Sequence, residues 1–479
     1  MYRECIKDEI KSKEIINEEL NKKISCEELS KEIVFEKLFD SYNYGNLGMF
    51  VGAGFSKGVF GGNGKPALNW FELIKKVSEK LELDFPEEND LIGVSLPELS
   101  TILCKQLQNR YKQSYYDAKS IFKEKVCEIS NWIPNEERID VFRKLFDKIQ
   151  PNWIITTNYD LVLESILTGK CKSLSPVNYL SAPKGIIPIY HIHGTRLDKD
   201  SIIITQDDYI PLFRPNEYRQ SKLAMTIRES TTLVLGYALG DMNVLSSLDW
   251  SKNIYTEKNE YPYEIVQAFW TSEPKENPYR DENGNIIIEI DDIGNFLEEL
   301  SGYLIDKKKE YDKMLNELEI LCGRLTEDDE ELIERFINKG DFRIELLDLV
   351  SKFEYNMINP YIEFLIRCLS KVYEKTTMDG NFTAYDNYLR IVLNIIIKYD
   401  YNKMPPRLFQ YIARELDWVL SKVGEHANKY YIGKSFKATD TWHKEKKSIP
   451  EEMIRQLYSY SQQNYLYNLK YFMDDLCKW

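Results

Sequence analysis

Four short clusters hold the side chains of this 479-residue chain whose types and spacing could bind or transform a ligand. The first is the glycine turn Gly52-Ala53-Gly54-Phe55-Ser56, and the second is Thr156-Thr157-Asn158-Tyr159-Asp160. The third is the pair His193-Gly194, and the fourth is Gly236-Tyr237. Together they offer backbone N–H groups for a phosphate, an amide and a carboxylate for orienting a substrate, and an imidazole that can accept a proton.

Taken singly, each cluster also has a simpler structural interpretation. Gly52 and Gly54 would let backbone N–H groups approach a pyrophosphate, but their spacing to Gly58 misses the dinucleotide-binding fingerprint by one residue and also fits a tight turn. Asn158 or Asp160 could cap a helix. A single histidine after a strand is more often a hydrogen-bonded structural residue than a catalyst. The order and setting of the clusters therefore carry more weight than any one of them.

The elements around these clusters predict an α/β fold. A short apolar run precedes each cluster, and a fifth run lies further on: residues 48–51, 153–155, 186–190, 232–235 and 286–290. Continuous apolar runs separated by helices are typical of a mainly parallel, Rossmann-like sheet with helices on both faces. The polar clusters would then lie at the carboxyl edge of the sheet, where such folds bind ligands. A helix is predicted over 69–81, capped by Asn69.

The chain divides into three predicted parts. Residues 1–40 have the spacing of a helical arm, and residues 41–300 hold the sheet, with a helical insertion at about 85–150. From 301 to 479 the pattern is entirely helical, without a fixed-period repeat. Helices are predicted there over 303–324, 328–338, 361–373, 385–397, 406–423 and 450–476.

Composition narrows the function classes. Hydrophobic residues make up 43% and charged residues 29%, as in ordinary globular proteins. A net charge of −14 argues against a broad nucleic-acid-binding surface. The N-terminus lacks the apolar stretch of a secretion signal, and no apolar run approaches the length of a membrane helix, so we expect a cytoplasmic protein with no membrane contact. Eight cysteines without a Cys-x-x-Cys pair, and four histidines, predict no metal site.

In their order along the chain, the four clusters resemble the sirtuin-like family, the NAD-consuming proteins related to the silent-information-regulator deacylases. The resemblance runs from about residue 48 to 300 and includes Pro66 and Trp70 after the glycine turn and Asp241 after Gly236-Tyr237. It implies that NAD+ is the substrate and that Asn158 and His193 are catalytic. It also implies contacts to NAD+ from Gly52, Ala53, Gly54, Phe55, Ser56, Pro66, Thr157, Asp160, Gly236 and Tyr237.

Two departures from the deacylases are informative. Deacylases of this family carry a four-cysteine zinc module after the His-Gly pair, whereas the segment from His193 to Gly236 contains no cysteine. Their Asp-Phe-Arg sequence is replaced by Ala67-Leu68-Asn69. What remains resembles the bacterial sirtuin-like effectors of antiphage defence, which hydrolyse NAD+ to ADP-ribose and nicotinamide. A protein deacylase or ADP-ribosyltransferase, and a non-catalytic NAD-binding scaffold, are the alternatives.

Because an unrestrained NAD+ hydrolase would poison its own cell, the resting enzyme is expected to be inactive. The resemblance implies control by assembly into a homo-oligomer or by a protein partner, such as a HerA-like ring ATPase or a short Argonaute. The arm and the C-terminal helices are the predicted regulatory parts. A purely structural role for these helices is the alternative.

Overall fold

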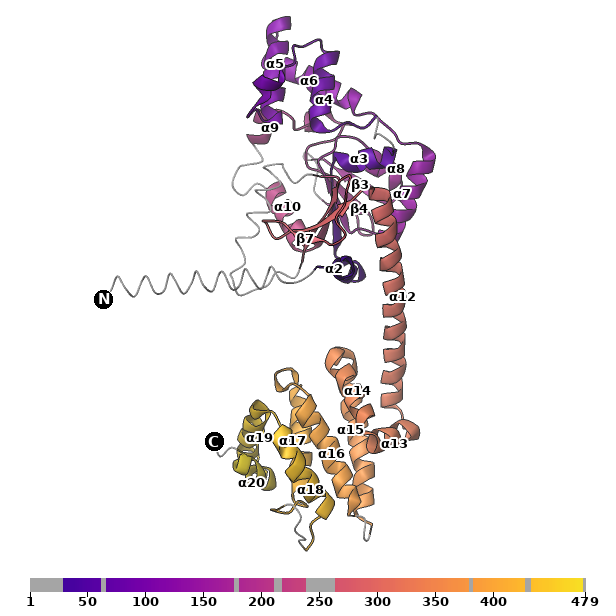
Figure 1. Cartoon of the computed structure of the whole chain (residues 1–479), viewed down its shortest axis with the longest axis vertical. Helices are drawn as coiled ribbons and strands as arrows, with labels where there is room; N and C mark the ends of the chain where they lie inside the picture. The colour runs from indigo at the N-terminus through magenta and orange to yellow at the C-terminus, as the bar shows by residue number, and fades with distance from the viewer. Residues whose placement is uncertain are drawn as a thin grey trace, which may run out of the picture. The chain divides into compact units, whose positions relative to one another are not determined.

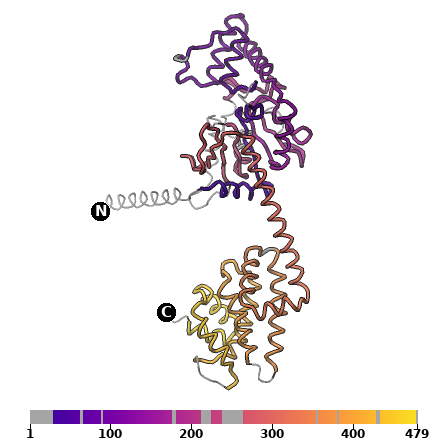
Figure 2. Tube along the Cα trace, turned by 45° about the vertical axis from the view of Figure 1, so that its right-hand side comes forward, coloured from indigo at the N-terminus to yellow at the C-terminus, as the bar shows by residue number. Residues whose placement is uncertain are grey.

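The computed structural model describes residues 29–61, 66–175, 181–210, 218–237, 263–378, 382–426 and 432–476. These residues form two compact units, of which the first extends to Glu310 and the second begins at Tyr311 (Figures 1 and 2). Most of the predicted N-terminal arm, residues 1–28, lies outside the described residues, as does Asp241. The described end of the arm is α2 (Lys31–Asn43), which begins after Ser30 because the Ser30 side chain accepts the N–H of Ile33.

The first unit is built on an eight-stranded sheet with the order β3-β4-β2-β1-β5-β6-β8-β7. Every neighbouring pair is parallel except β7 with β8, which confirms the predicted Rossmann-like, mainly parallel sheet. The strands are β1 (Leu47–Val51), β2 (Trp153–Thr156), β3 (Cys171–Leu174), β4 (Ile187–His191), β5 (Thr231–Leu235), β6 (Ile265–Trp270), β7 (Tyr279–Arg280) and β8 (Ile286–Ile290).

The register of the central strands brings their carboxyl ends together. Val51, the last residue of β1, is paired with Thr156 at the end of β2 and with Leu235 at the end of β5. The chain runs from β1 toward β2 on one side and returns to β5 on the other, so the strand order reverses at β1. Open α/β sheets bind ligands at such a reversal, just beyond the strand ends.

Helices cover this sheet and extend from it. They are α3 (Ala53–Phe60), α4 (Trp70–Lys80), α5 (Leu96–Tyr111), α6 (Tyr115–Ile129), α7 (Glu136–Ile149), α8 (Val162–Ile166), α9 (Gln206–Tyr209), α10 (Tyr218–Arg228) and the start of α12 (Ile293–Thr326), with short 3₁₀ helices at Glu88–Leu91 and Lys199–Ser201. The predicted cap of α4 is confirmed, since Asn69 and Glu72 form a reciprocal capping box. Figure 1 shows α4, α5, α6 and α9 gathered at one end of the unit, beyond the sheet.

The described part of the second unit is helical, as predicted. Its helices are α13 (Glu330–Asn338), α14 (Gly340–Lys352), α15 (Glu354–Thr376), α16 (Thr383–Lys398), α17 (Pro406–Leu420), α18 (Phe436–Glu445), α19 (Glu451–Gln463) and α20 (Tyr467–Leu476), with 3₁₀ helices at Tyr401–Lys403 and Lys446–Ser448. Their apolar faces share one core that includes Trp442, Phe364 and Leu416. The predicted single helix over 450–476 is wrong, because the chain turns at Tyr465, whose φ is +58°. No helix within the described ranges is long and apolar enough to cross a membrane.

Candidate active site

Two glycine turns meet directly beyond β1 and β5. The N–H of Gly52 donates to Leu235 O (2.9 Å), and the N–H of Gly54 donates to Gly236 O (2.8 Å). A Cβ on Gly236, where φ is +59°, would lie 2.0 Å from Phe55 N, so only glycine fits this approach. The two N–H groups that the sequence suggested for a pyrophosphate are therefore bonded to the neighbouring turn. The glycines form the wall of the site by letting the turns approach.

Three polar side chains, Ser56, Asn158 and Asp160, form a buried cluster next to these turns. Asn158 Nδ2 donates to Ser56 Oγ (3.1 Å), and Ser56 Oγ donates to the two carboxylate oxygens of Asp160 (3.2 and 3.1 Å). The same carboxylate accepts the N–H of Val162 (3.0 Å), the first residue of α8. The N-cap position of that helix is Leu161, so neither Asn158 nor Asp160 is the helix cap. Burial raises the pKa of Asp160 to about 6, although the bonds from Val162 and Ser56 oppose the rise.

A buried pair, His191 and Glu164, contacts the backbone of this cluster at Asn158. His191 Nε2 lies 2.7 Å from Glu164 Oε1, and His191 Nδ1 lies 3.0 Å from the backbone oxygen of Asn158. Ser173 Oγ also donates to Glu164 Oε1 (2.5 Å). Burial alone would lower the pKa of His191, but the facing Glu164 carboxylate gives a net rise. Burial would likewise raise the pKa of Glu164, and His191 gives a net decrease. The pair therefore favours an imidazolium that holds the Asn158 carbonyl.

His193 lies two residues further on and has a different environment. The Tyr209 hydroxyl is 3.4 Å from His193 Nε2, and the rings of Trp70 and Tyr209 lie 5.7 and 5.5 Å from the imidazole, centroid to centroid. Gly194 adopts a φ of +90°, and a Cβ there would lie 2.2 Å from Ser201 O. The His-Gly sequence thus reflects a turn that only glycine can make, and that turn places the imidazole among aromatic rings.

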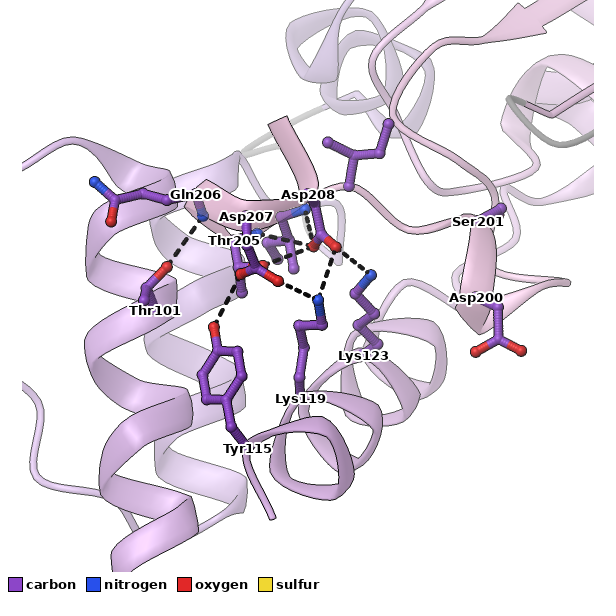
Figure 3. Close-up of polar contacts among 12 residues, drawn as sticks. Thr101, Tyr115, Lys119, Lys123, Asp200, Ser201, Thr205, Gln206, Asp207 and Asp208 are labelled. Atoms are coloured by element: carbon purple, nitrogen blue, oxygen red, sulfur yellow. Dashed lines mark hydrogen bonds and ion pairs between the residues drawn. The ribbon is translucent and has the colours of Figure 1, made fainter. Parts of the chain in front are cut away.

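An ion-pair cluster fixes the short helix α9, which carries Tyr209 (Figure 3). Asp208 pairs with Lys123 (2.8 Å) and Lys119 (3.2 Å), while Asp207 pairs with Lys119 and accepts the Tyr115 hydroxyl (3.0 Å). The lysines and Tyr115 belong to α6, so the helical insertion is attached to the segment that follows the His-Gly turn. This arrangement holds Tyr209 against His193.

These groups surround a cavity of about 780 Å³ at the carboxyl edge of the sheet. Such a volume is in the range of small-molecule and cofactor sites. The predicted site residues that line it are Ala53, Gly54, Thr157, Asn158, Asp160, His193, Gly236 and Tyr237. Those that do not line it are Gly52, Phe55, Ser56 and Pro66. Ser56 lies behind Asn158 and Asp160, and Phe55 points into the core against Phe142 and Phe146 of α7.

The remaining lining comes from residues that were not in the predicted site. They are Leu68, Asn69, Trp70, Leu73, Val94, Ser95, Leu96, Pro97, Ser130, Trp132, Tyr159, Gln206 and Tyr209. Trp70 could have been included, since it belongs to the motif that follows the glycine turn. The segments around Ser95, Trp132 and Tyr209 carry no local signal, because they reach the cavity only through the packing of the helical insertion.

Three polar atoms in this lining have no hydrogen-bond partner among the described residues. They are the indole Nε1 of Trp70, the indole Nε1 of Trp132 and the hydroxyl of Ser130. Buried polar atoms are normally satisfied, so unsatisfied donors in a cavity wall indicate a ligand or ordered water there. No group of three His, Cys, Asp or Glu side chains in the described ranges is arranged to hold a metal ion.

Comparison with known proteins finds a described domain that is similar to part of the first unit. Residues 152–288 match the model of the SIR2-like domain, a span that contains Asn158, Asp160, His193 and Gly236. The chain carries a SIR2-like domain. The matched span begins directly before β2, so it does not include β1 and the glycine turn that follows it. These lie beside the matched residues because β1 pairs with β2 in the sheet.

Two curated relatives extend the comparison. The chain is 27% identical over 221 residues to an NAD(+) hydrolase ThsA of Acinetobacter baumannii (strain 532279), covering 44% of this chain and 40% of that protein. It is 24% identical over 201 residues to an NAD(+) hydrolase ThsA of Cytobacillus dafuensis, covering 41% of this chain and 36% of that protein. The chain thus spans less than half the length of the curated relatives it matches.

Proposed function

We propose that this chain hydrolyses NAD+ to ADP-ribose and nicotinamide in the cavity of the first unit. The observation that carries the proposal is the convergence of Asn158, Asp160 and His193 on that cavity, at the strand-order reversal of a SIR2-like domain. Similarity to two proteins named as NAD(+) hydrolases supports the same substrate.

The chemistry requires little from the protein beyond positioning. Nicotinamide leaves a cationic ribosyl pyridinium as a neutral molecule, so the step needs no general acid. The site has to orient the ribose and a water, and to stabilise an oxocarbenium-like transition state. Asn158 orients the water and the ribose, Asp160 accepts a hydrogen bond from the nicotinamide carboxamide, and His193 takes a proton from the ribose hydroxyl or the water.

The rest of the dinucleotide needs a surface that side chains do not obstruct. Gly54 and Ala53 would lie along the pyrophosphate, and Gly236 with Tyr237 along the adenosine half. Trp70 Nε1 and Trp132 Nε1 are buried donors on the same wall and would add hydrogen bonds to the ligand. NAD+ is the substrate in this account, and no metal takes part.

In the cell, this activity would serve antiphage defence by depleting NAD+. The resemblance to sirtuin-like defence effectors supports that role. We propose that the enzyme acts in the cytoplasm and is switched on by homo-oligomer assembly or by a protein partner, such as a HerA-like ring ATPase or a short Argonaute. The helical second unit and the N-terminal arm are the proposed regulatory parts. With a net charge of −14, any recognition of nucleic acid would fall to a more basic partner.

One assay separates hydrolysis from the two alternatives. The full chain is incubated with NAD+, alone and with the proteins encoded beside it, in the presence and absence of an acyl-lysine peptide, while nicotinamide and ADP-ribose are measured. Hydrolysis predicts equal amounts of both products without any peptide. Nicotinamide that appears only with the peptide would indicate a deacylase or transferase. Binding of NAD+ without any product would indicate a scaffold.

A further inference from the structure

The second unit contains a small cavity of its own, with a volume of about 170 Å³. It lies where α16 packs against both α14 and α18, which Figure 1 labels within the helical unit. Its lining residues are Gly340, Arg343, Arg390, Leu393, Asn394, Ile397, Thr441 and Glu445. Two arginines in one small cavity are unusual, because guanidinium groups repel each other unless an anion lies between them.

Arg343 is the more buried of the two, with 8% of its surface exposed. Its Nε donates to Asn394 Oδ1 (2.8 Å), and its Nη1 donates to the backbone oxygens of Phe336 (2.9 Å) and Ile337 (3.0 Å). All three acceptors are neutral. Among the described residues, none accepts a hydrogen bond from Nη2, and that atom lies 3.5 Å from where a Cβ on Gly340 would be. The absence of a side chain at Gly340 leaves space beside Nη2.

The charge of Arg343 has no carboxylate counter-ion within the described ranges. The two backbone oxygens come from the last turn of α13, whose helix dipole offsets part of the charge. Burial lowers the pKa of Arg343, and repulsion from the positive charge of Arg390 acts in the same direction. Buried charges in proteins are almost always paired, since an isolated one is costly to desolvate. An unpaired guanidinium at a cavity wall therefore indicates an anionic ligand.

Arg390 already has a carboxylate counter-ion. It can therefore donate hydrogen bonds to a ligand without depending on that ligand to balance its charge. Its Nε pairs with Asp386 Oδ2 (3.0 Å), and its Nη2 donates to Thr441 Oγ1 (2.6 Å). Thr441 Oγ1 in turn donates to Asp386 Oδ1 (2.5 Å). This network orients the guanidinium, although the Arg390 side chain is 48% exposed. A rigid, planar donor fork of this kind suits the oxygens of a phosphate.

We propose that the cavity between α14, α16 and α18 binds a phosphate group, held by Arg343, Arg390 and the first turn of α14 beside Gly340. Asn394, whose Oδ1 accepts from Arg343 Nε, also lines the cavity. Helix N-termini favour anions, and α14 is 13 residues long. The volume accommodates one phosphate group with a few waters but not a whole nucleotide. The group is therefore either a free phosphate ion or the terminal phosphate of a nucleotide whose remainder extends out of the cavity.

Glu445 allows a test of whether the bound ligand is an anion or a cation. Glu445 lines the same cavity at the end of α18, and its negative charge would repel a bound anion. Glu445→Gln should therefore tighten phosphate binding, whereas loss of a guanidinium should weaken it. A site for a cation would show the opposite pattern for both changes.

The experiment measures binding of inorganic phosphate to the full chain by calorimetry and by thermal unfolding, at constant ionic strength with chloride as the balancing ion. We expect saturating phosphate to raise the unfolding midpoint of the wild type by a few degrees. Arg390→Gln and Gly340→Ala should each weaken binding about tenfold, because one removes a donor and the other fills the space beside Nη2. Glu445→Gln should tighten it several-fold.

Controls separate this site from any phosphate subsite in the first unit. Arg407→Gln removes an exposed arginine of the second unit that donates to Asn359 Oδ1 (3.3 Å) and does not line the cavity, so phosphate binding should not change. Adenosine monophosphate is tested in parallel. If it binds with the same dependence on Arg390 and Glu445, the ligand is a nucleotide phosphate, and if only inorganic phosphate does so, it is the free ion. No phosphate binding, or binding unaffected by Gly340→Ala and Glu445→Gln, would overturn the proposal.

Discussion

His191 and His193 leave the same strand end two residues apart, yet the molecule uses them in opposite ways. Both histidines are buried, with exposed fractions of 1% and 2%. Both ring nitrogens of His191 have protein partners, Glu164 and the carbonyl of Asn158. His193 faces the cavity beside Tyr209 and Trp70. Strand alternation would place these two positions on the same face. They separate because β4 ends at His191 and the chain turns there, with the N–H of Gly194 donating to His191 O (3.0 Å).

The comparison distinguishes two sides of the strand ends. On the supporting side, Glu164 and His191 are bonded to each other, and His191 also contacts the backbone oxygen of Asn158. On the cavity side, Asn158, Asp160 and His193 face space that a ligand can fill. Catalytic groups are held in place by neighbours that never touch the ligand. Substitutions on the supporting side should therefore act first on stability, and those on the cavity side first on activity.

The largest effect is expected at the meeting of the glycine turns. In Gly236→Ala the new Cβ would lie 2.0 Å from Phe55 N, and the φ of +59° disfavours any side chain. We expect a loss of more than about 5 kcal/mol in the free energy of unfolding, or no folded protein, measured by chemical denaturation. Gly185→Ala is the matched control, because its φ is +84° but no atom lies within 4 Å of the added Cβ. It should cost only about 1 kcal/mol, and equal losses would contradict the account.

Breaking the buried pair should come next. His191→Ala leaves Glu164 buried without its partner and should lower the free energy of unfolding by about 3–5 kcal/mol. Because the pKa of His191 is raised in the folded state, its contribution to the free energy of unfolding is complete below pH 6.5. That contribution is lost as the pH rises through the pKa that His191 has in the folded state. The lowered pKa of Glu164 makes its contribution present above pH 4.5 and lost on acidification.

The difference in stability between wild type and His191→Ala should therefore be greatest between pH 4.5 and 6.5. Denaturation at several pH values measures it. A difference that keeps growing above pH 8 would show that the imidazole is neutral in the folded protein.

Asp160 should give a smaller dependence on pH, in the same direction as that of His191. Its pKa is raised from 3.8 to about 6, so the folded state holds the proton more tightly than the unfolded state. The stability of the wild type relative to Asp160→Asn should fall as the pH rises from 3.8 to about 6, by about 3 kcal/mol, and then stay level. A pH-independent difference would mean that the carboxyl group titrates normally.

The smallest effect is expected at Ser56, which lies behind Asn158 and Asp160 and bonds to both. Ser56→Ala removes the bonds to Asn158 and Asp160 and should lower the free energy of unfolding by about 1 kcal/mol. Because the Ser56 hydroxyl lowers the pKa of Asp160, that pKa should rise further in the variant. Ser100→Ala, which removes a bond within α5 only, should leave the titration of Asp160 unchanged. The shift can be followed by NMR of the carboxyl carbon.

Much of the first unit could be predicted from sequence because its information is local. The apolar strands β1, β2, β4, β5 and β8 are short continuous runs, and the parallel sheet follows from them. Three strands, β3, β6 and β7, were missed. The apolar run of β6 is interrupted by Gln267. β3 is a partly exposed edge strand with Cys171, Lys172 and Ser173, and β7 has two residues within a polar segment. Helices α14 and α18 were also missed.

The site shows the same division between local and long-range information. The residues at the strand ends, such as Asn158 and His193, could be found because motif and strand coincide in sequence. Tyr209 and Trp132 could not, since they reach the cavity through the ion pairs and packing of the helical insertion. The pairing of His191 with Glu164 joins residues 27 apart and has no signature in either segment.

The central claim is that His193 acts on NAD+ in this cavity, and one comparison tests it most directly. Wild type, His193→Ala and His443→Ala are incubated with NAD+ under the conditions that activate the wild type, and nicotinamide and ADP-ribose are measured. His443 is the control because it lies in the second unit and bonds to Gly424 O. We predict that His193→Ala releases both products at least about 100-fold more slowly, with an unchanged unfolding midpoint, while His443→Ala matches the wild type. Equal rates for His193→Ala and the wild type would contradict the account.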